Sequence, residues 1–200
     1  MLAEHFCSRF VLTRNSLAAG QPLPVQKGPV PLADGVPATP QHAAVLVPIV
    51  DYGNQLKVLF TQRALHLRHH PGQISFPGGR IEPGETSCSA ALREAEEEIG
   101  LAQTEVSLLG RLPAQDTTTG FIIEPWVGII SPQRGFQLQV SEVAAVFEVP
   151  LSHFLPRQNR HQLSLTLRGK TRDLHFMPYQ DKFIWGATAA IMHQLCLQLA

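Results

Sequence analysis

Residues 78–100 read GGRIEPGETSCSAALREAEEEIG, and this stretch decides the fold. Thr86 suits the N-cap of a helix and Gly100 suits the position just after a helix end, so the spacing predicts a helix from Thr86 to Ile99. One side of this helix carries an apolar stripe that would anchor it to a sheet, formed by Cys88, Leu92, Ala95 and Ile99. The glycines before the helix allow the backbone to bend sharply or to approach a ligand closely. We therefore expect a glycine-rich loop followed by a helix that packs on a sheet.

The opposite side of the predicted helix is acidic. Glu94, Glu97 and Glu98 occupy positions i, i+3 and i+4, which places three carboxylates on one face. One interpretation is a solvated acidic face, although such faces usually carry interleaved lysines and this one has none. The other is that a hard divalent cation relieves the repulsion, since oxygen ligands on one rigid element suit Mg²⁺ or Mn²⁺. Glu85 and Arg93 favour the second interpretation, because an ion pair between them would hold the loop over the acidic face.

The fixed positions of this stretch resemble the Nudix box. They are Gly79, Glu85 and the run from Arg93 to Leu101. The resemblance implies an α/β fold, a Nudix-like α/β/α sandwich with a central mixed sheet, and Mg²⁺-dependent hydrolysis of a nucleoside diphosphate linked to another moiety. It also implies metal ligation by three carboxylates, those of Glu94, Glu97 and Glu98, often with a backbone carbonyl near Gly78. Glu85 and Arg93 then belong to the catalytic machinery.

The residues just before the box narrow the expected substrate. LFTQRALHLRHHPGQISFPGG (59–79) is similar to the additional signature of the coenzyme A pyrophosphatase branch of the Nudix superfamily. Its matching positions are Leu59, Thr61, Arg63, Ala64, Arg68, Gly72 and Phe76 to Gly79, while Phe60 replaces a leucine. The resemblance implies cleavage of coenzyme A or its derivatives to 4′-phosphopantetheine, or its acyl form, and adenosine 3′,5′-bisphosphate. Arg63 and Arg68 are candidate phosphate-binding residues, because guanidinium groups match phosphate oxygens, and Gly78 and Gly79 are candidate backbone contacts.

The sequence leaves more than one candidate for the general base and more than one for the function. Metal-assisted attack needs a base near the nucleophilic water, and Glu97, Glu142 and Asp116 are all candidates. Trp126 and Trp185 are expected to be core residues, since aromatic residues in strands and helices usually are. A rival function is hydrolysis of another nucleoside diphosphate derivative, such as ADP-ribose, NADH or a capped RNA end. A second rival is a non-catalytic Nudix-like binding module, which would be expected to lack one of the box carboxylates.

The remaining pattern predicts one catalytic domain behind an N-terminal arm. Residues 1–42 are expected to form a helix over residues 2 to about 15 and a proline-rich arm, and residues 43–200 the Nudix hydrolase domain. Apolar runs predict strands at 43–50, 56–63, 73–76, 105–112, 121–130 and 143–149, with two short strands within 163–177. The first two of these strands should pair as a hairpin. Pro77-Gly78-Gly79 is expected to leave regular structure, and 183–199 is expected to form a closing helix.

Composition excludes several classes of partner. The chain has 200 residues, with 16 Lys and Arg against 16 Asp and Glu, so no long-range field attracts nucleic acid or a membrane surface. Residues 183–200 are too short and polar to span a bilayer. Three scattered cysteines match neither a zinc site nor a disulfide scaffold, which favours reduced thiols and a cytoplasmic location. The expected partner is a small-molecule substrate, and the oligomeric state stays open.

Overall fold

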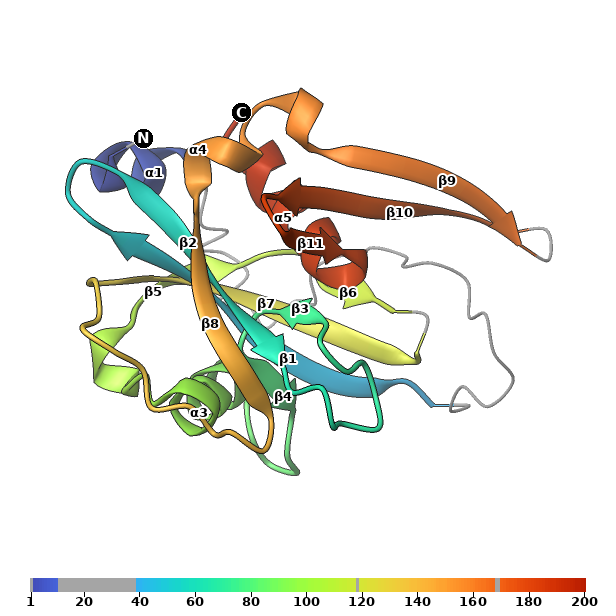
Figure 1. The fold of residues 1–200 in the computed structure, drawn as a ribbon, viewed down its shortest axis with the longest axis horizontal. Coiled ribbons are helices and arrows are strands. Elements are labelled where there is room, and N and C mark those ends of the chain that lie inside the picture. The colour runs from blue at the N-terminus through green and yellow to red at the C-terminus, as the bar shows by residue number, and fades with distance from the viewer. Residues whose placement is uncertain (1, 11–38, 118, 168–169) are drawn as a thin grey trace.

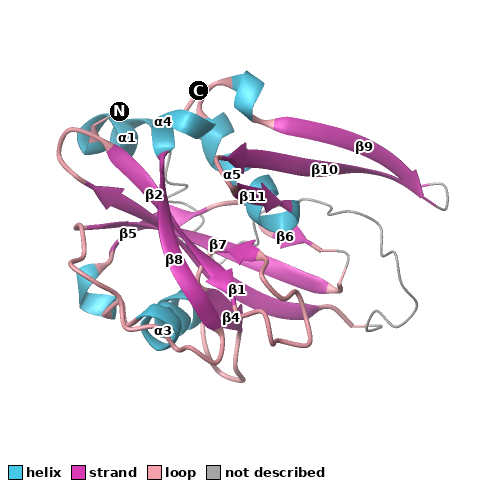
Figure 2. Cartoon of the chain, in the orientation of Figure 1, coloured by secondary structure: helices cyan, strands magenta, loops and turns pink. Residues whose placement is uncertain are grey.

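A mixed sheet forms the centre of the fold (Figure 1 and Figure 2). The computed structural model describes residues 2–10, 39–117, 119–167 and 170–200. Within these ranges the sheet contains β1 (Gln41–Asp51), β2 (Leu56–Arg63), β3 (Ile74–Ser75), β4 (Gly78–Arg80), β5 (Ser107–Arg111), β6 (Gln115–Asp116), β7 (Phe121–Ile130) and β8 (Val143–Pro150). β1 and β7 are parallel, and the other pairings are antiparallel. The predicted α/β fold with a central mixed sheet is confirmed.

Helices cover both faces of this sheet. The side chains of β1 alternate between two hydrophobic clusters, with Ile49 in one and Leu46 in the other. The cluster that holds Leu46 is closed by α3 (Ser87–Ile99). The cluster that holds Ile49 is closed by α1 (Ala3–Arg9), α4 (Leu151–Phe154) and α5 (Gly186–Gln198). This two-sided burial explains why β1 reads as a continuous apolar run rather than an alternating one.

The first two strands pair as predicted, but only at one end. Ile49 to Asp51 of β1 pair with β2, whereas Ala43 to Val45 pair with β4. Gly78 and Gly79 therefore lie within a short strand, so the prediction that they leave regular structure is wrong. The physical reason is close approach, because a Cβ at Gly78 would lie 2.4 Å from the backbone oxygen of Ala44. Only glycine lets β4 pack against β1 at this distance.

The C-terminal part forms a second, three-stranded antiparallel sheet. It consists of β9 (His161–Leu167), β10 (Lys170–Tyr179) and β11 (Lys182–Trp185). β9 and β10 are longer than the two short strands predicted, and they extend beyond the central sheet in Figure 1. The prediction of a helix from residue 183 is also wrong, because Phe183 and Trp185 pair with Pro178 and Phe176 before α5 begins at Gly186. None of the helices in the described parts of the chain is long and apolar enough to cross a membrane.

The N-terminal helix contacts the end of the C-terminal helix. Phe6 and Phe10 are buried, and their rings stack with centroids 5.9 Å apart. The Arg9 guanidinium donates a hydrogen bond of 2.8 Å to the carbonyl oxygen of Leu199. The helix is shorter than predicted within the described residues, since Phe10 forms its C-cap, and residues 11–15 and most of the predicted proline-rich arm lie outside those ranges. Two short 3₁₀ helices, Gln103–Glu105 and Arg157–Asn159, complete the elements of the described residues.

Candidate active site

The acidic helix α3 begins and ends where its sequence predicts. The side chain of Thr86 accepts a hydrogen bond of 3.1 Å from the backbone N–H of Ser89, and Gly100 adopts a left-handed conformation with φ of 71°. Ala95 and Ile99 are completely buried against the sheet. These contacts fix the rotation of the helix about its axis, so that Glu94 and Glu97 lie toward the loop before the helix, while Glu98 is buried beside β4.

The three carboxylates lie in different environments. Glu98 is 5% exposed, whereas the side chain of Glu97 is 58% exposed. Glu98 accepts a hydrogen bond of 3.2 Å from the backbone N–H of Gly78, which joins α3 to β4. Burial raises the pKa of Glu98 to about 8, and burial also raises the pKa of Glu94. Both carboxyl groups would therefore gain from a nearby cation that stabilises their charged form.

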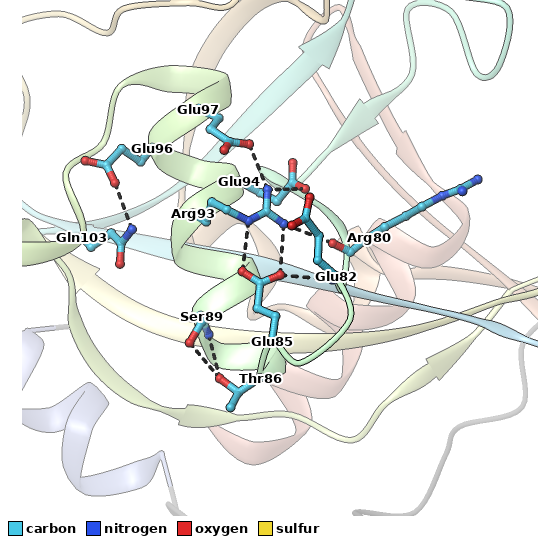
Figure 3. A network of polar contacts seen from close by, with 10 residues as sticks. All are labelled: Arg80, Glu82, Glu85, Thr86, Ser89, Arg93, Glu94, Glu96, Glu97 and Gln103. Carbon is cyan, nitrogen blue, oxygen red and sulfur yellow. Dashed lines mark hydrogen bonds and ion pairs between the residues drawn. The ribbon is translucent and has the colours of Figure 1, made fainter.

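Arg93 ties the loop to the helix, as shown in Figure 3. Its Nε and Nη2 atoms donate to the two carboxylate oxygens of Glu85 at 3.0 and 3.2 Å, so the ion pair expected from the sequence is present. Nη1 bridges to Glu94 at 3.0 Å and Glu97 at 2.9 Å, and Nη2 also donates to the carbonyl oxygen of Arg80 at 3.2 Å. This fork lowers the pKa of Glu85. One guanidinium thus holds the glycine-rich loop and two acidic side chains together.

The acidic face suits a hard divalent cation by its chemistry, although its side chains are not gathered into a finished site. In the described part of the chain, no three His, Cys, Asp or Glu side chains converge as metal ligands. Arg93 instead neutralises Glu94 and Glu97. The donors are all oxygens, as Mg²⁺ and Mn²⁺ prefer. Gly79 leaves the space that Glu94 occupies, since a Cβ there would lie 2.4 Å from the Glu94 carboxylate carbon.

A cavity of about 330 Å³ lies beside β4. Gly78 and Gly79 line it, as does Arg63 from the end of β2. Asp116 from β6 lines it as well, together with Thr117 and Thr119 from the following loop. The cavity therefore brings together residues from segments that are far apart in the sequence. Its polar lining lies against the same glycines that contact Glu94 and Glu98.

The structure separates the two arginines that the sequence singled out. Arg63 is half-buried, and its charge lowers the pKa of Glu98, so it lies near the acidic face as well as in the cavity. Arg68 is exposed on the following loop and is not among the residues that line the cavity. The two positions look equivalent in the sequence because both are arginines in one basic segment. They differ because Arg63 is the last residue of β2, whereas Arg68 lies in the loop that follows.

The three candidates for the general base also lie in different parts of the site. Glu97 extends to solvent beside Arg93, and Asp116 lines the cavity. Glu142 is exposed just before β8, and its charge contributes to raising the pKa values of Glu94 and Glu98. Glu142 is thus electrostatically coupled to the acidic face, even though about forty residues of chain separate it from α3. The geometry keeps all three as candidates.

Sequence reasoning missed a polar network at the start of α3. Ser87 donates to Glu124 at 2.9 Å and accepts from the Trp126 indole N–H at 3.1 Å. Arg111 also donates to Glu124, at 2.9 Å. These residues come from α3, β5 and β7, so no spacing along the chain could have indicated their contact. Trp126 is a core residue as predicted, but Trp185 is 39% exposed and lines the cavity, so the prediction for Trp185 is wrong.

Burial of Glu98 predicts a pH dependence of the metal-free protein. A carboxyl group whose folded-state pKa is raised stabilises the fold below its unfolded pKa of about 4.3, and this contribution is lost as the pH rises toward 8. We expect Glu98 to lower the free energy of unfolding by about 1 kcal/mol between pH 6 and pH 7, because each unit in this window approaches the full linkage slope. Urea unfolding in the presence of a chelator measures it.

The glutamine variant isolates this contribution. Glu98→Gln should lose the slope, because the amide stays neutral and its oxygen can still accept from the Gly78 N–H. Glu96→Gln, a change at an exposed position of the same helix, should keep it. Parallel stability profiles for the wild type and Glu98→Gln would contradict the assignment.

Comparison with known proteins identifies the family. The NUDIX domain family matches residues 40–182. The chain is 44% identical over 160 residues to an uncharacterized Nudix hydrolase NudL of Enterobacter sp. (strain 638), covering 80% of this chain and 83% of the relative. It is 41% identical over 197 residues to a protein of the same description from Shigella flexneri serotype 5b, covering 98% and 94%. A crystal structure of a MutT NUDIX hydrolase from Burkholderia pseudomallei has a TM-score of 0.49 and 18% identity, covering 78% of this chain and 98% of that one.

The chain belongs to the Nudix family, because the family match spans well over half of its length. Hydrolases of this family act on nucleoside diphosphate derivatives and generally use a divalent metal such as Mg²⁺ or Mn²⁺. The candidate site of this molecule consists of the acidic face of α3, the Arg93 fork and the adjoining cavity.

Proposed function

We propose that this Nudix hydrolase cleaves the pyrophosphate of coenzyme A or its derivatives. The products are 4′-phosphopantetheine, or its acyl form, and adenosine 3′,5′-bisphosphate. The observation that carries the proposal is the position of Arg63. It lines the cavity beside Gly78 and Gly79, and its charge lowers the pKa of Glu98. Arg63 belongs to the segment 59–79 that is similar to the coenzyme A pyrophosphatase signature. A substrate with a pyrophosphate and a separate phosphate needs cationic side chains beside its metal site.

Each residue of the site has its own role in the proposed reaction. Glu94, Glu97 and Glu98 would hold Mg²⁺ or Mn²⁺, which when bound neutralises charge on the pyrophosphate oxygens. Water attacks one phosphorus, the bridging P–O bond breaks, and a carboxylate accepts the proton that the water loses. We assign this proton to Glu97 or Glu142. The ion pair between Arg93 and Glu85 holds the loop before α3 against the helix.

Arg63 should control selectivity as well as rate. Arg63→Ala is expected to reduce kcat/KM for coenzyme A at least about tenfold, because loss of one charge-assisted phosphate contact costs roughly 1.5–3 kcal/mol. If Arg63 binds the 3′-phosphate, the preference for coenzyme A over dephospho-coenzyme A falls with it, since the latter lacks that group. Steady-state kinetics with both substrates measures the ratio. An unchanged ratio would assign Arg63 to the pyrophosphate.

Arg68→Ala provides the comparison for this variant. It removes the same charge from an exposed position outside the cavity lining, so we expect a smaller loss than for Arg63→Ala. A larger loss at Arg68 would mean that its loop closes over the substrate and would reverse the assignment of the two arginines.

The substrate class is tested by product analysis. Coenzyme A, ADP-ribose, NADH and a capped RNA end should be incubated separately with the full chain and Mg²⁺, and the products identified by mass spectrometry. Preferred release of adenosine 3′,5′-bisphosphate supports the proposal, whereas preferred cleavage of another substrate replaces it with the first rival. A non-catalytic module would release nothing, but retention of Glu94, Glu97 and Glu98 argues against that alternative.

A further inference from the structure

A row of paired residues crosses the central sheet beneath α3 and consists of Gly79 of β4, Ala44 of β1 and Glu124 of β7. Residues paired across neighbouring strands point to the same face of a sheet. At one end of the row, the Glu124 carboxylate accepts a hydrogen bond of 2.9 Å from the Ser87 hydroxyl. At the other end, Gly79 leaves the space that the Glu94 carboxylate occupies. The row therefore meets α3 at both of its ends.

The length of the helix between these two contacts matches the width of the row. Glu94 follows Ser87 by seven residues, which corresponds to a rise of about 10.5 Å along a helix. The row covers two strand spacings, from β7 over β1 to β4, which is about 9.6 Å. A helix that is fixed at Ser87 over β7 thus places Glu94 in the space at Gly79 over β4.

The buried side chains of α3 fix its position along its axis only weakly. Apart from Glu98 and Ile99 near the end of the helix, the buried residues of α3 are Ala90, Ala91 and Ala95. An alanine methyl group makes few contacts and forms a shallow ridge, so it resists sliding over a sheet less than a longer side chain does. The polar contacts at the start of the helix are therefore important for its axial position.

Ser87 makes these polar contacts, and it is the first residue of α3. Its hydroxyl accepts a hydrogen bond of 3.1 Å from the Trp126 indole N–H and donates to Glu124. Arg111 in turn holds Glu124, because its Nη1 donates at 2.9 Å to the same carboxylate oxygen. The side chains of Arg111 and Glu124 are only 16% and 20% exposed, so solvent screens this ion pair less than a surface pair. The sheet thus holds the first turn of α3 through well-anchored side chains.

We propose that Glu124 is a positioning residue for the metal site, and that it acts through Ser87 on the place of Glu94. This inference rests on the proposed function, in which carboxylates of α3 hold the divalent metal. A shift of α3 along its axis would move the Glu94 carboxylate out of the space at Gly79. Loss of the hydrogen bond between Ser87 and Glu124 therefore weakens metal binding without removing a ligand.

Binding of Mn²⁺ to the full chain without substrate provides the readout, because oxygen ligands suit Mn²⁺ as well as Mg²⁺ and free Mn²⁺ is measured by electron paramagnetic resonance. Ser87→Ala should raise the Kd for Mn²⁺ at least about fivefold. Loss of a direct partner of a metal ligand typically costs about 10–100-fold in affinity, and this hydrogen bond acts one contact further away. The helix should stay folded, since alanine favours helix more than serine and the ion pair between Arg111 and Glu124 remains.

Ser89→Ala is the matched control. It makes the same chemical change in the same turn of α3, but at an exposed position. The backbone N–H of Ser89, which donates to the Thr86 side chain, is unchanged, so the N-cap is kept. We expect the wild-type Kd for Mn²⁺ in this variant.

Two variants of Glu124 separate its hydrogen bonds from its charge. One oxygen of Glu124 accepts from both Ser87 and Arg111, and a glutamine amide oxygen can accept the same two bonds. Glu124→Gln should therefore keep most of the Mn²⁺ affinity, whereas Glu124→Ala should lose at least as much as Ser87→Ala. Thermal unfolding is measured in parallel, and a lower Tm with an unchanged Kd would assign Glu124 a structural role alone.

The outcomes distinguish this inference from the proposed function. An unchanged Kd in Ser87→Ala, with Mn²⁺ bound by the wild type, overturns the inference alone. An equal rise of the Kd in Ser87→Ala and Ser89→Ala also overturns it, because the effect would then belong to the whole first turn. Absence of Mn²⁺ binding by the wild type overturns the metal site of the proposed function and this inference with it.

Discussion

Replacing Glu97 by glutamine lowers kcat at least about a hundredfold, because the change removes a metal ligand or the general base while leaving the size of the side chain the same. The fold should be preserved, since the Glu97 side chain is 58% exposed and contributes to no core cluster. Its contact with Nη1 of Arg93 is one of several that this guanidinium makes. Steady-state kinetics on the cleaved substrate, together with thermal unfolding, measures both effects.

The same helix offers the control. Glu96 is exposed beside Glu97, and its carboxylate accepts a hydrogen bond of 2.9 Å from the Gln103 side chain on the outer side of α3. Glu96→Gln makes the identical chemical change one residue away and should keep near-normal turnover. Near-normal turnover of Glu97→Gln would remove Glu97 from the site. A wild-type rate that a chelator does not change would remove the metal from the reaction.

Alanine at the two neighbouring glycines of β4 should produce opposite defects. At Gly78 an added Cβ would lie 2.4 Å from the Ala44 carbonyl oxygen and 2.6 Å from the Val45 Cα, and backbone atoms cannot move aside cheaply. We expect Gly78→Ala to reduce the free energy of unfolding by about 3 kcal/mol. At Gly79 the added Cβ meets the carboxylate of Glu94, a side chain that can turn away. Gly79→Ala should keep most of its stability but need about tenfold more Mg²⁺ for half-maximal rate.

Two measurements separate these defects. Urea unfolding without metal should rank Gly78→Ala well below Gly79→Ala, and titration of the rate with Mg²⁺ should show the shift at Gly79. Gly84→Ala is a comparison at a glycine whose added Cβ would meet nothing within 4 Å, although its φ of 84° disfavours alanine. Equal loss of stability at Gly78 and Gly79 would mean that β4 shifts as a unit and would contradict this account.

Much of the central architecture follows from local sequence. The limits of α3 depend on Thr86 and Gly100, which act within one turn of the helix, and the faces of the helix depend on its 3.6-residue period. The Glu85–Arg93 pair was predictable because only the N-cap and the first turns of α3 separate its members. The strands β1, β2, β7 and β8 were predictable because their apolar runs have the length of strands rather than of helices.

Predictions failed where long-range pairing decided the outcome. Residues 183–185 have an apolar composition that suits a helix or a strand, and pairing with β10 makes them a strand. Gly78 and Gly79 read as a loop because their local preference is weak, and pairing with β1 makes them a strand. Trp185 appeared to be core because the exposed face of a small sheet cannot be recognised before its partners are known.

The sequence by itself determined that three carboxylates share one helix face, because helical spacing requires it. Only the tertiary structure decided that Glu98 is the buried one, because β4 and its Gly78 N–H cover that side of α3. The sequence placed two arginines in one basic segment, but the course of the chain after β2 brings Arg63 into the cavity lining and not Arg68. Burial, pKa and access depend on segments that meet across the sheet, and no local spacing encodes those contacts.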